Sequence, residues 1–121
     1  MAQEISKAPF AILHIPHSSI EIPVEVHQNL ILTNEELEEE LLSMTDRYTD
    51  ELFSLDSRTA NQVVFRYSRL VVDPERFVDD AVESMLEIGM GVINSRTSDG
   101  MVLREDISKE ERSLLICKYY V

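Results

Sequence analysis

The order of apolar and polar residues near the start of the chain predicts a strand followed by a functional loop. Phe10 to Leu13 form a continuous apolar run, which is typical of a strand covered on both faces. Pro16 lacks the N–H that a central strand needs, and it holds Ile15 extended, so the next residues should lie on a loop. These loop residues are His17, Ser18 and Ser19. Ligands bind at such strand ends in open α/β sheets, which makes this loop the first candidate site.

A long amphipathic helix is predicted next. Thr33 and Glu36 have the spacing of a capping box, in which each side chain accepts a hydrogen bond from the backbone of the other residue. The apolar residues that follow at helical spacing are Leu37, Leu41, Met44, Tyr48 and Leu52. The pattern predicts one helix from Thr33 to about Leu55. The five glutamates between residues 34 and 40 favour the helix dipole and are expected to face solvent.

Two acids further along this helix are candidates for a site. Asp46 and Asp50 are four residues apart, so on a helix they would lie on one side, together with Leu42 and Phe53. An acid in that position would be half-buried. The alternative is a pair of surface carboxylates that flank Arg47, and the spacing alone favours this surface pair.

The second half of the chain predicts shorter elements. The β-rich runs Val63–Phe65 and Leu70–Val72 fit two strand segments or one bent strand. The remaining elements are a helix from Asp79 or Asp80 closed by Gly89, a strand at 91–93, a turn at 97–100, a strand at 101–103 and a helix capped by Ser108 and Glu111.

The three histidines have different expected roles. His17 could be a metal ligand, a general base, or a loop histidine bonded to its neighbours, and a histidine beside serines favours the last of these. His14 should point to the opposite face of the extended segment, so we expect it to be buried and hydrogen-bonded rather than to share a metal with His17. His27 has no partner at a useful spacing and is expected in solvent.

Arg69 and Arg76 are candidate anion-binding residues. A guanidinium group matches a carboxylate through two parallel hydrogen bonds, so the pair could clamp an anionic substrate. The alternative pairs the arginines with nearby acids, namely Asp73, Glu75 and Asp79. The sequence leaves both interpretations open.

Composition narrows the class of protein. The 121 residues fit one domain spanning 1–121, with a globular 44% of hydrophobic residues. A net charge of -12 argues against nucleic acid or an anionic membrane as partner. Cys117 is the single cysteine, which excludes an internal disulfide and a thiolate metal cluster. No apolar segment is long enough to cross a bilayer, and we expect a cytoplasmic protein.

Four segments in order resemble the N-formylglutamate amidohydrolase family. They are LHIPHSS at 13–19, TDRYTDELF at 45–53, SRLVVDPERF at 68–77 and GMGVINSRTSDGMVLR at 89–104. The resemblance implies a metal-dependent hydrolase of small N-acyl acidic amino acids such as N-formylglutamate, in the type of reaction found in histidine degradation. It also implies an α/β fold akin to zinc carboxypeptidases, a three-layer α/β/α arrangement with a mixed central sheet.

The resemblance also implies roles for individual residues. His17 would be the first ligand of a divalent metal, expected to be zinc, and Asp46 its carboxylate partner. Arg69 would act in catalysis and clamp the substrate carboxylate. Arg76 and Ser18 would be further substrate-binding residues.

One position departs from the family pattern. Family members have an Asn-Arg pair where this chain has Glu75 and Arg76. A carboxylate there would repel an anionic substrate, so either the substrate differs or Glu75 turns away.

The family resemblance also predicts that the site needs more residues. Family members continue past the point where this sequence stops, through a further histidine-bearing segment and an acid that would supply the general base. A catalytic zinc takes three protein ligands, whereas His17 and Asp46 supply two unless His14 or His27 moves in. We therefore expect a domain that is incomplete at its C-terminus.

Two functions follow from this expectation. The chain is either an amidohydrolase completed by more sequence or by a second copy, or a non-catalytic binding or assembly module. A homodimer is expected in both cases, because uncovered strand edges and apolar helix faces associate. The surfaces proposed for burial are Met85, Leu86 and Ile88, and Leu114, Leu115 and Tyr119.

Overall fold

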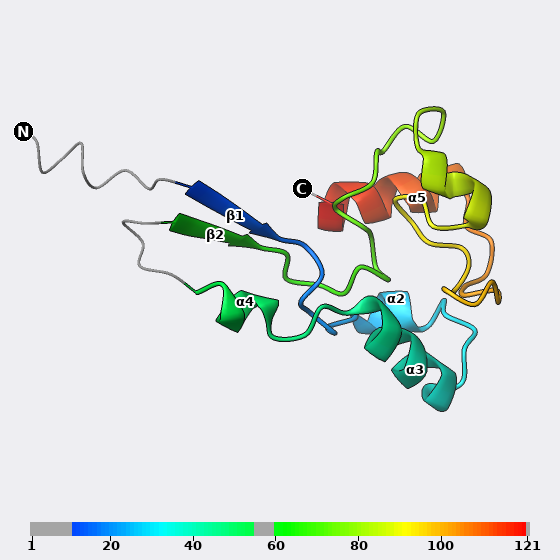
Figure 1. The fold of residues 1–121 in the computed structure, drawn as a ribbon. Coiled ribbons are helices and arrows are strands. Elements are labelled where there is room, and N and C mark those ends of the chain that lie inside the picture. Colours follow the sequence, from blue (N-terminus) through cyan, green and yellow to red (C-terminus); the bar gives the residue numbers. More distant parts are fainter. Residues whose placement is uncertain (1–10, 55–59, 121) are drawn as a thin grey trace, which may run out of the picture.

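The computed structural model describes residues 11–54 and 60–120, so Phe10 and Leu55 lie outside the described residues. Strands β1 (Ala11–Ile15) and β2 (Ala60–Val64) pair in parallel. The register runs from Ala11 opposite Ala60 to Ile15 opposite Val64. Figure 1 shows these strands as a ribbon that projects from the rest of the molecule. The described elements form an α/β fold, and the two strands seen are parallel.

The expectation of a strand covered on both faces is wrong for the described residues. Ile12 is 71% exposed, and His14 is exposed rather than buried. Only Ile15 of β1 is buried, where the ribbon enters the body of the molecule. The apolar run did form a strand, but none of the described residues cover its outer part.

The helices of the first half are shorter than the sequence pattern predicts. They are α2 (Val24–His27), α3 (Asn34–Met44) and α4 (Thr49–Leu52). The capping box is confirmed, because Thr33 Oγ1 accepts a bond from Glu36 N at 3.2 Å and Glu36 Oε1 accepts one from Thr33 N at 2.9 Å. His27 is exposed, as predicted.

The prediction of one helix to about Leu55 is wrong. Thr45 adopts an extended conformation after α3, and Tyr48 has a left-handed φ of 67° before α4. Asp46 therefore lies in a connection rather than on a helix face with Asp50. Tyr48 and Leu52 are 63% and 74% exposed, so the predicted apolar stripe ends at Met44.

One of the five glutamates on α3 is not in solvent. Glu40 is 4% exposed, and its carboxylate accepts hydrogen bonds from Ser98 N at 2.8 Å and Ser98 Oγ at 3.0 Å. It ties α3 to the turn near Gly100, whose φ of 83° fits the predicted glycine turn. The prediction of a wholly solvated acidic face is therefore wrong at Glu40.

The second half consists of loops and short helices. The helices are the 3₁₀ helix η1 (Ser84–Ile88), α5 (Lys109–Leu115) and the π-helix η2 (Ile116–Tyr120). Gly89 ends η1 with a φ of 75°, and Ser108 Oγ accepts from Glu111 N at 3.1 Å, so both predicted helix boundaries are confirmed. The start of η1 differs, because Glu83 caps it in place of Asp79 or Asp80. The runs at 70–72, 91–93 and 101–103 are not strands; Arg96–Val102 and Leu30–Arg104 are isolated bridges.

The core is built around the buried segment Leu70–Val72. Val71 and Val72 pack with Val26 and Tyr119, and Leu70 packs against α3. The residues of the second cluster are Leu37, Met44, Leu70 and Leu103. Tyr119 is 4% exposed, so its predicted place on an association surface is wrong.

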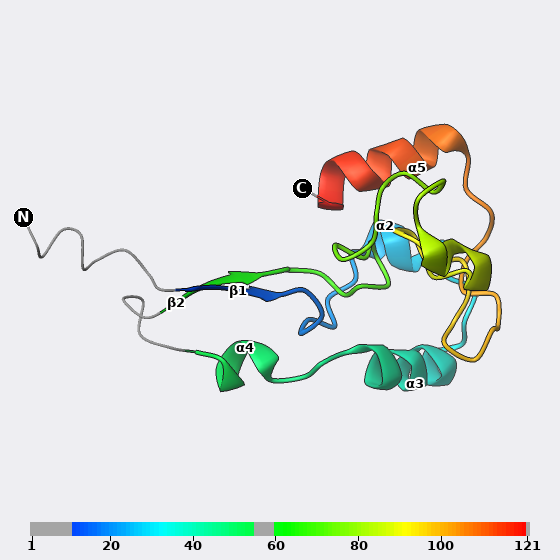
Figure 2. The same ribbon diagram turned by 45° about the horizontal axis from the view of Figure 1, so that its top comes forward.

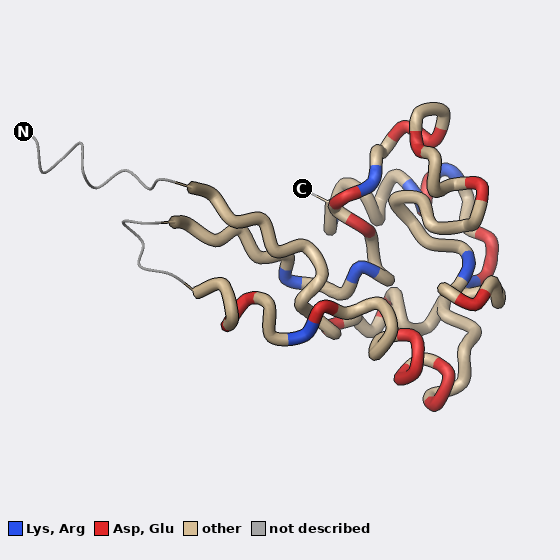
Figure 3. The backbone as a smooth tube through the Cα atoms, in the orientation of Figure 1, with Lys and Arg blue, Asp and Glu red and all other residues tan. Residues whose placement is uncertain are grey.

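Helices lie on two sides of the ribbon, and the acidic residues are concentrated on one of these helices. Figure 2 shows the ribbon of β1 and β2 nearly edge-on, with α3 and α4 on one side and α5 on the other. Acidic residues gather on α3, whereas neither strand carries Lys, Arg, Asp or Glu (Figure 3). No helix in the described part of the chain is long and apolar enough to cross a membrane.

Candidate functional site

His17 lies where the ribbon joins the core, two residues after the last residue of β1. Its side chain is 5% exposed. Its carbonyl oxygen accepts a hydrogen bond from Asp46 N at 2.8 Å, which fixes the connection between α3 and α4 against the loop. The predicted position of His17 at a strand end is confirmed.

Asp73 holds the imidazole of His17 from the core side. Its side chain is fully buried, and Oδ1 lies 2.8 Å from His17 Nε2. Arg69 donates to Asp73 Oδ2 from Nε at 3.1 Å and from Nη2 at 2.8 Å, and Glu75 N donates to Oδ1 at 3.0 Å. One carboxylate therefore joins a histidine, an arginine and a backbone amide.

The surroundings of Asp73 keep it ionised. Burial alone would raise the pKa of its carboxyl, but the hydrogen bonds from His17 and Glu75 N and the positive charge of Arg69 together outweigh burial and lower this pKa to about 2. An ionised carboxylate only accepts hydrogen bonds, so His17 must donate from Nε2. In a neutral imidazole the lone pair is then on Nδ1.

Asp46 faces that second ring nitrogen. Its Oδ2 lies 3.8 Å from His17 Nδ1, and its side chain is 63% exposed. Zinc binds histidine nitrogen and carboxylate oxygen at about 2 Å, so two ligand atoms can be up to about 4 Å apart. The donor set and spacing of His17 and Asp46 thus fit two ligands of one metal ion. Within residues 11–54 and 60–120, no three histidine, cysteine, aspartate or glutamate side chains form a group that could hold a metal.

Arg76 lies near the same Asp73 oxygen as Arg69. Its Nε donates to the carbonyl oxygen of Met90 at 3.1 Å, and Nη2 is 4.0 Å from Asp73 Oδ2. Its side chain is 17% exposed and that of Arg69 is 14% exposed. Of the two interpretations left open by the sequence, the one that pairs these arginines with a nearby acid describes the contacts seen.

Comparison with known proteins places the chain in a family. The family model described as N-formylglutamate amidohydrolase matches residues 10–121. The chain belongs to the N-formylglutamate amidohydrolase family. No curated protein sequence matches the chain significantly.

A solved member of the amidohydrolase family has the same fold over this region. The crystal structure of N-formylglutamate amidohydrolase from Ralstonia eutropha JMP134 superimposes with a TM-score of 0.79 at 20% sequence identity. The match covers 93% of this chain and 44% of that one, so the chain spans less than half the length of the solved protein. At this identity the likeness shows the fold.

The candidate site brings together most of the residues singled out from the sequence. Arg69 and Arg76 contact Asp73, which in turn contacts His17, and Asp46 lies beside the ring of His17. The exposed His14 and His27 are not in the described group of contacts.

Ser18 lines a neighbouring hollow. This hollow has a volume of about 240 Å³, and residues on the connection and α4 form its opposite wall: Arg47, Tyr48, Asp50 and Glu51. Its position beside His17 suits a substrate-binding residue. The substrate-binding roles of Ser18, Arg69 and Arg76 stay predictions.

Sequence reasoning missed the central role of Asp73. It named Asp73 only as a possible partner for the arginines, and His17 lies 56 residues away. The available signal was the apolar run Leu70–Val72 directly before it, because an acid that ends a buried segment needs internal partners.

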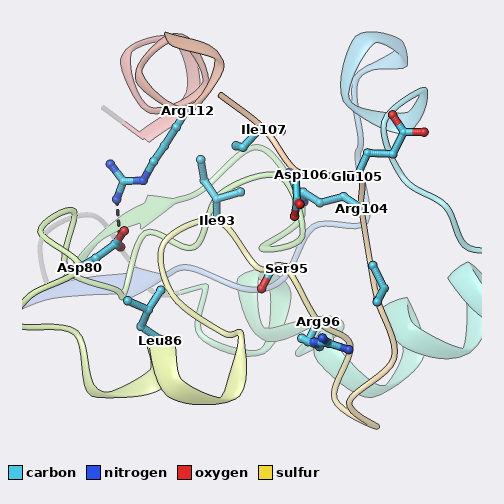
Figure 4. A pocket seen from close by; sticks show the side chains of 11 residues that line it. Asp80, Leu86, Ile93, Ser95, Arg96, Arg104, Glu105, Asp106, Ile107 and Arg112 are labelled. Atoms are coloured by element: carbon cyan, nitrogen blue, oxygen red, sulfur yellow. Dashed lines mark hydrogen bonds and ion pairs between the residues drawn. The ribbon is translucent and has the colours of Figure 1, made fainter. Parts of the chain in front are cut away.

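A larger hollow lies elsewhere, and it does not include the residues around His17. It has a volume of about 530 Å³ and is lined in part by Leu86, Arg104 and Arg112 (Figure 4). Arg112 donates to Asp80 at 3.0 Å across one side of it. This hollow mixes paired charges with apolar walls, and it is not adjacent to the candidate metal ligands.

Proposed function

We propose that the chain provides part of a metal-dependent amidohydrolase site, with His17 and Asp46 as ligands of a divalent cation, zinc being the first candidate. The supporting observation is the environment of His17. Asp73 fixes the proton on Nε2, and Nδ1 faces the Asp46 carboxylate 3.8 Å away. Metal-binding histidines commonly donate their other N–H to a carboxylate in this way.

Each residue of the proposed site would have its own role in binding and hydrolysis. A bound metal of this kind supplies a water molecule with a pKa near 7 and polarises the scissile carbonyl. Asp73 orients His17 and also holds Arg69, whose Nη1 is not used in its two bonds to Asp73. Arg69 and Arg76 would bind the carboxylate of an N-acyl amino acid, and Arg69 would stabilise charge developing during hydrolysis. Ser18 would contact the substrate from the neighbouring hollow.

N-formylglutamate is the first substrate to test, because it is named in the description of the family. Cleavage of its amide also needs a third metal ligand and a general base. We propose that further sequence or a second copy supplies them, since the chain spans 44% of the related structure. The complete unit would have the three-layer fold with a mixed central sheet and would act in the cytoplasm.

The second candidate function is a non-catalytic binding or assembly module. The uncharged and exposed ribbon of β1 and β2 favours it, because a parallel pair is normally covered on both faces. In this case the fold would be kept for association, and the residues around His17 would bind no metal.

Metal binding separates the two candidates. Isothermal titration calorimetry should show that zinc binds to the purified chain with a stoichiometry of about one ion per chain. Asp46→Asn should weaken binding by about 10-fold or more, since it removes a charged ligand. Asp50→Asn is the matched control, because it removes the same charge four residues further on. A chain without zinc affinity, or equal zinc affinity in the Asp46 and Asp50 variants, would contradict the metal site.

A further inference from the structure

Glu75 is directed into the site. Its backbone N donates to Asp73 Oδ1 at 3.0 Å, which anchors the residue beside the buried acid. Its side-chain Oε2 lies 3.9 Å from His17 Nε2 and the side chain is 47% exposed. Of the two alternatives considered for this position, a carboxylate that turns away does not describe the structure. The other alternative, a different substrate, follows from the charges around it.

Each arginine of the site uses part of its guanidinium group for bonds inside the protein. Arg69 directs Nε and Nη2 to Asp73, and Arg76 directs Nε to the carbonyl oxygen of Met90. Glu75 forms no ion pair with either arginine, all three residues lying in the described part of the chain.

Among the charged side chains that contact His17 or Asp73, those that reach solvent most are negative, whereas the exposed Arg47 lines the neighbouring hollow. The side chains of Asp46 and Glu75 are 63% and 47% exposed, whereas those of Arg69 and Arg76 are 14% and 17% exposed. A ligand approaching from solvent therefore meets carboxylates before it meets the buried guanidinium groups. One bound divalent cation next to Asp46 would offset the charge of Asp46 but would leave Glu75 facing the ligand.

We propose that Glu75 is a specificity-determining residue that favours N-acyl amino acids with a neutral or cationic side chain over those with an acidic side chain. The inference rests on the proposed function, in which the two arginines take the carboxylate common to all N-acyl amino acids. A second carboxylate on the ligand would then lie near Glu75 and be repelled. An ammonium group in the same place would be attracted by Glu75. A neutral amide group would be neither attracted nor repelled by its charge.

The size of the effect follows from the exposure of Glu75. Two unit charges at 4 Å interact by about 1 kcal/mol in water and more in a partly buried site. For a half-exposed carboxylate this corresponds to a change in affinity of about fivefold for each charged ligand.

The test is a set of calorimetric titrations on the full chain in the presence of zinc. The ligands are N-formyl-L-glutamate, its neutral isostere N-formyl-L-glutamine, and Nα-formyl-L-lysine. Wild-type protein should bind the glutamate compound more weakly than the other two. Glu75→Gln should raise its affinity for the glutamate compound about fivefold, lower its affinity for the lysine compound by a similar factor and leave the glutamine compound unchanged. Glu38→Gln is the matched control, because it removes the same charge from an exposed position on α3. It should leave all three affinities as in wild type.

The outcomes distinguish this inference from the proposed function. The role of Glu75 would be overturned if the three ligands had the same affinities relative to one another in Glu75→Gln as in wild type. It would also be overturned if none of the three ligands bound measurably. Zinc affinity is measured separately. A chain that discriminates between the ligands without binding zinc would contradict the metal site while supporting the role of Glu75.

Discussion

Asp73 contacts three of the other candidate site residues, namely His17, Arg69 and Arg76. Its carboxylate contacts His17 and Arg69 while fully excluded from solvent. Replacing one member of such a buried charged group leaves the others without a partner, which is costly even where the intact group adds little stability. The contribution of Asp73 can therefore be measured as a change in the free energy of unfolding as well as a change in metal affinity.

Asp73→Asn should lower the free energy of unfolding by about 3 kcal/mol, because the Arg69 guanidinium keeps its charge and loses its counterion. Urea denaturation at neutral pH measures the change. Asp46→Asn is the matched control: its side chain is 63% exposed, so its stability should change by less than about 0.5 kcal/mol. A variant at Asp73 that is as stable as wild type would show that the buried bonds are not important to the fold.

At the scale of residues, the sequence predicted which side chains meet better than how they meet. The family resemblance placed His17 near Asp46, and the structure has their side chains 3.8 Å apart. The bond between His17 and Asp73 joins residues 56 positions apart, and no local pattern encodes such a contact. The direction of Glu75 was also open, because the sequence gives no side-chain orientation on a loop.

At the scale of elements, local signals worked at helix ends and failed within the connection after α3. The caps at Thr33 and Ser108 and the glycine at Gly89 are where the sequence predicts them, since each depends on a few neighbouring atoms. The break between α3 and α4 has no glycine or proline to announce it. There, Asp46 N bonds to the carbonyl of His17 at 2.8 Å instead of to its own helix, so a tertiary contact overrides the apolar period.

The acid that caps η1 should make stability depend on pH. Glu83 accepts bonds from Met85 N at 2.8 Å and Phe77 N at 2.9 Å, and these bonds lower the pKa of its carboxyl below the ordinary 4.5. A pKa lowered by folding adds stability above pH 4.5, and this stability is lost as the pH falls through the folded value. Glu83→Gln should therefore be less stable than wild type at neutral pH and should lose less stability on acidification.

Thermal unfolding followed at neutral pH and at about pH 3 measures this difference. Glu87→Gln is the matched control, since it removes the same charge from an exposed position on η1. The control should lose as much stability on acidification as wild type does. If Glu83→Gln also does so, then the carboxylate of Glu83 does not couple folding to protonation.

At the scale of the whole molecule, the class of fold was predictable and the extent of the sheet was not. Apolar runs indicated strands at 70–72 and 91–93, yet these segments are buried loops joined by the bond from Asp73 N to Val92 O at 2.7 Å. An apolar run does not by itself show whether a neighbouring strand is present. β1 is the converse case, because it has an apolar run and a partner strand, yet of its residues only Ile15 is buried by the described part of the chain.

The homodimer expected from the sequence should form through the ribbon of β1 and β2. Ile12 and Val63 are 71% and 54% exposed on strands without charged side chains, which is the kind of surface that pairs with another chain. Light scattering coupled to size exclusion should show a dimer. Val63→Lys should yield a monomer, because a lysine on a strand opposes pairing.

Ile88→Lys is the matched comparison, since it places the same charge on the exposed surface of η1, which the sequence pattern had suggested for burial. Ile88 is 57% exposed. A dimer retained in Ile88→Lys and lost in Val63→Lys places the interface on the ribbon. The reverse result places the interface on η1. If the wild-type protein remains a monomer as its concentration is raised, self-association is excluded.

The parallel register of β1 with β2 also has a consequence during synthesis on the ribosome. Ala11 pairs with Ala60, so its partner is translated 49 residues later. Until then β1 has no strand to bond with, and its uncharged segment leaves the ribosomal exit tunnel unpaired. Long-range parallel pairing of this kind is slow, because loop closure precedes any gain from contacts. The nascent chain should therefore bind chaperones through β1 before Val64 emerges, and the site around His17 should be assembled only after that release.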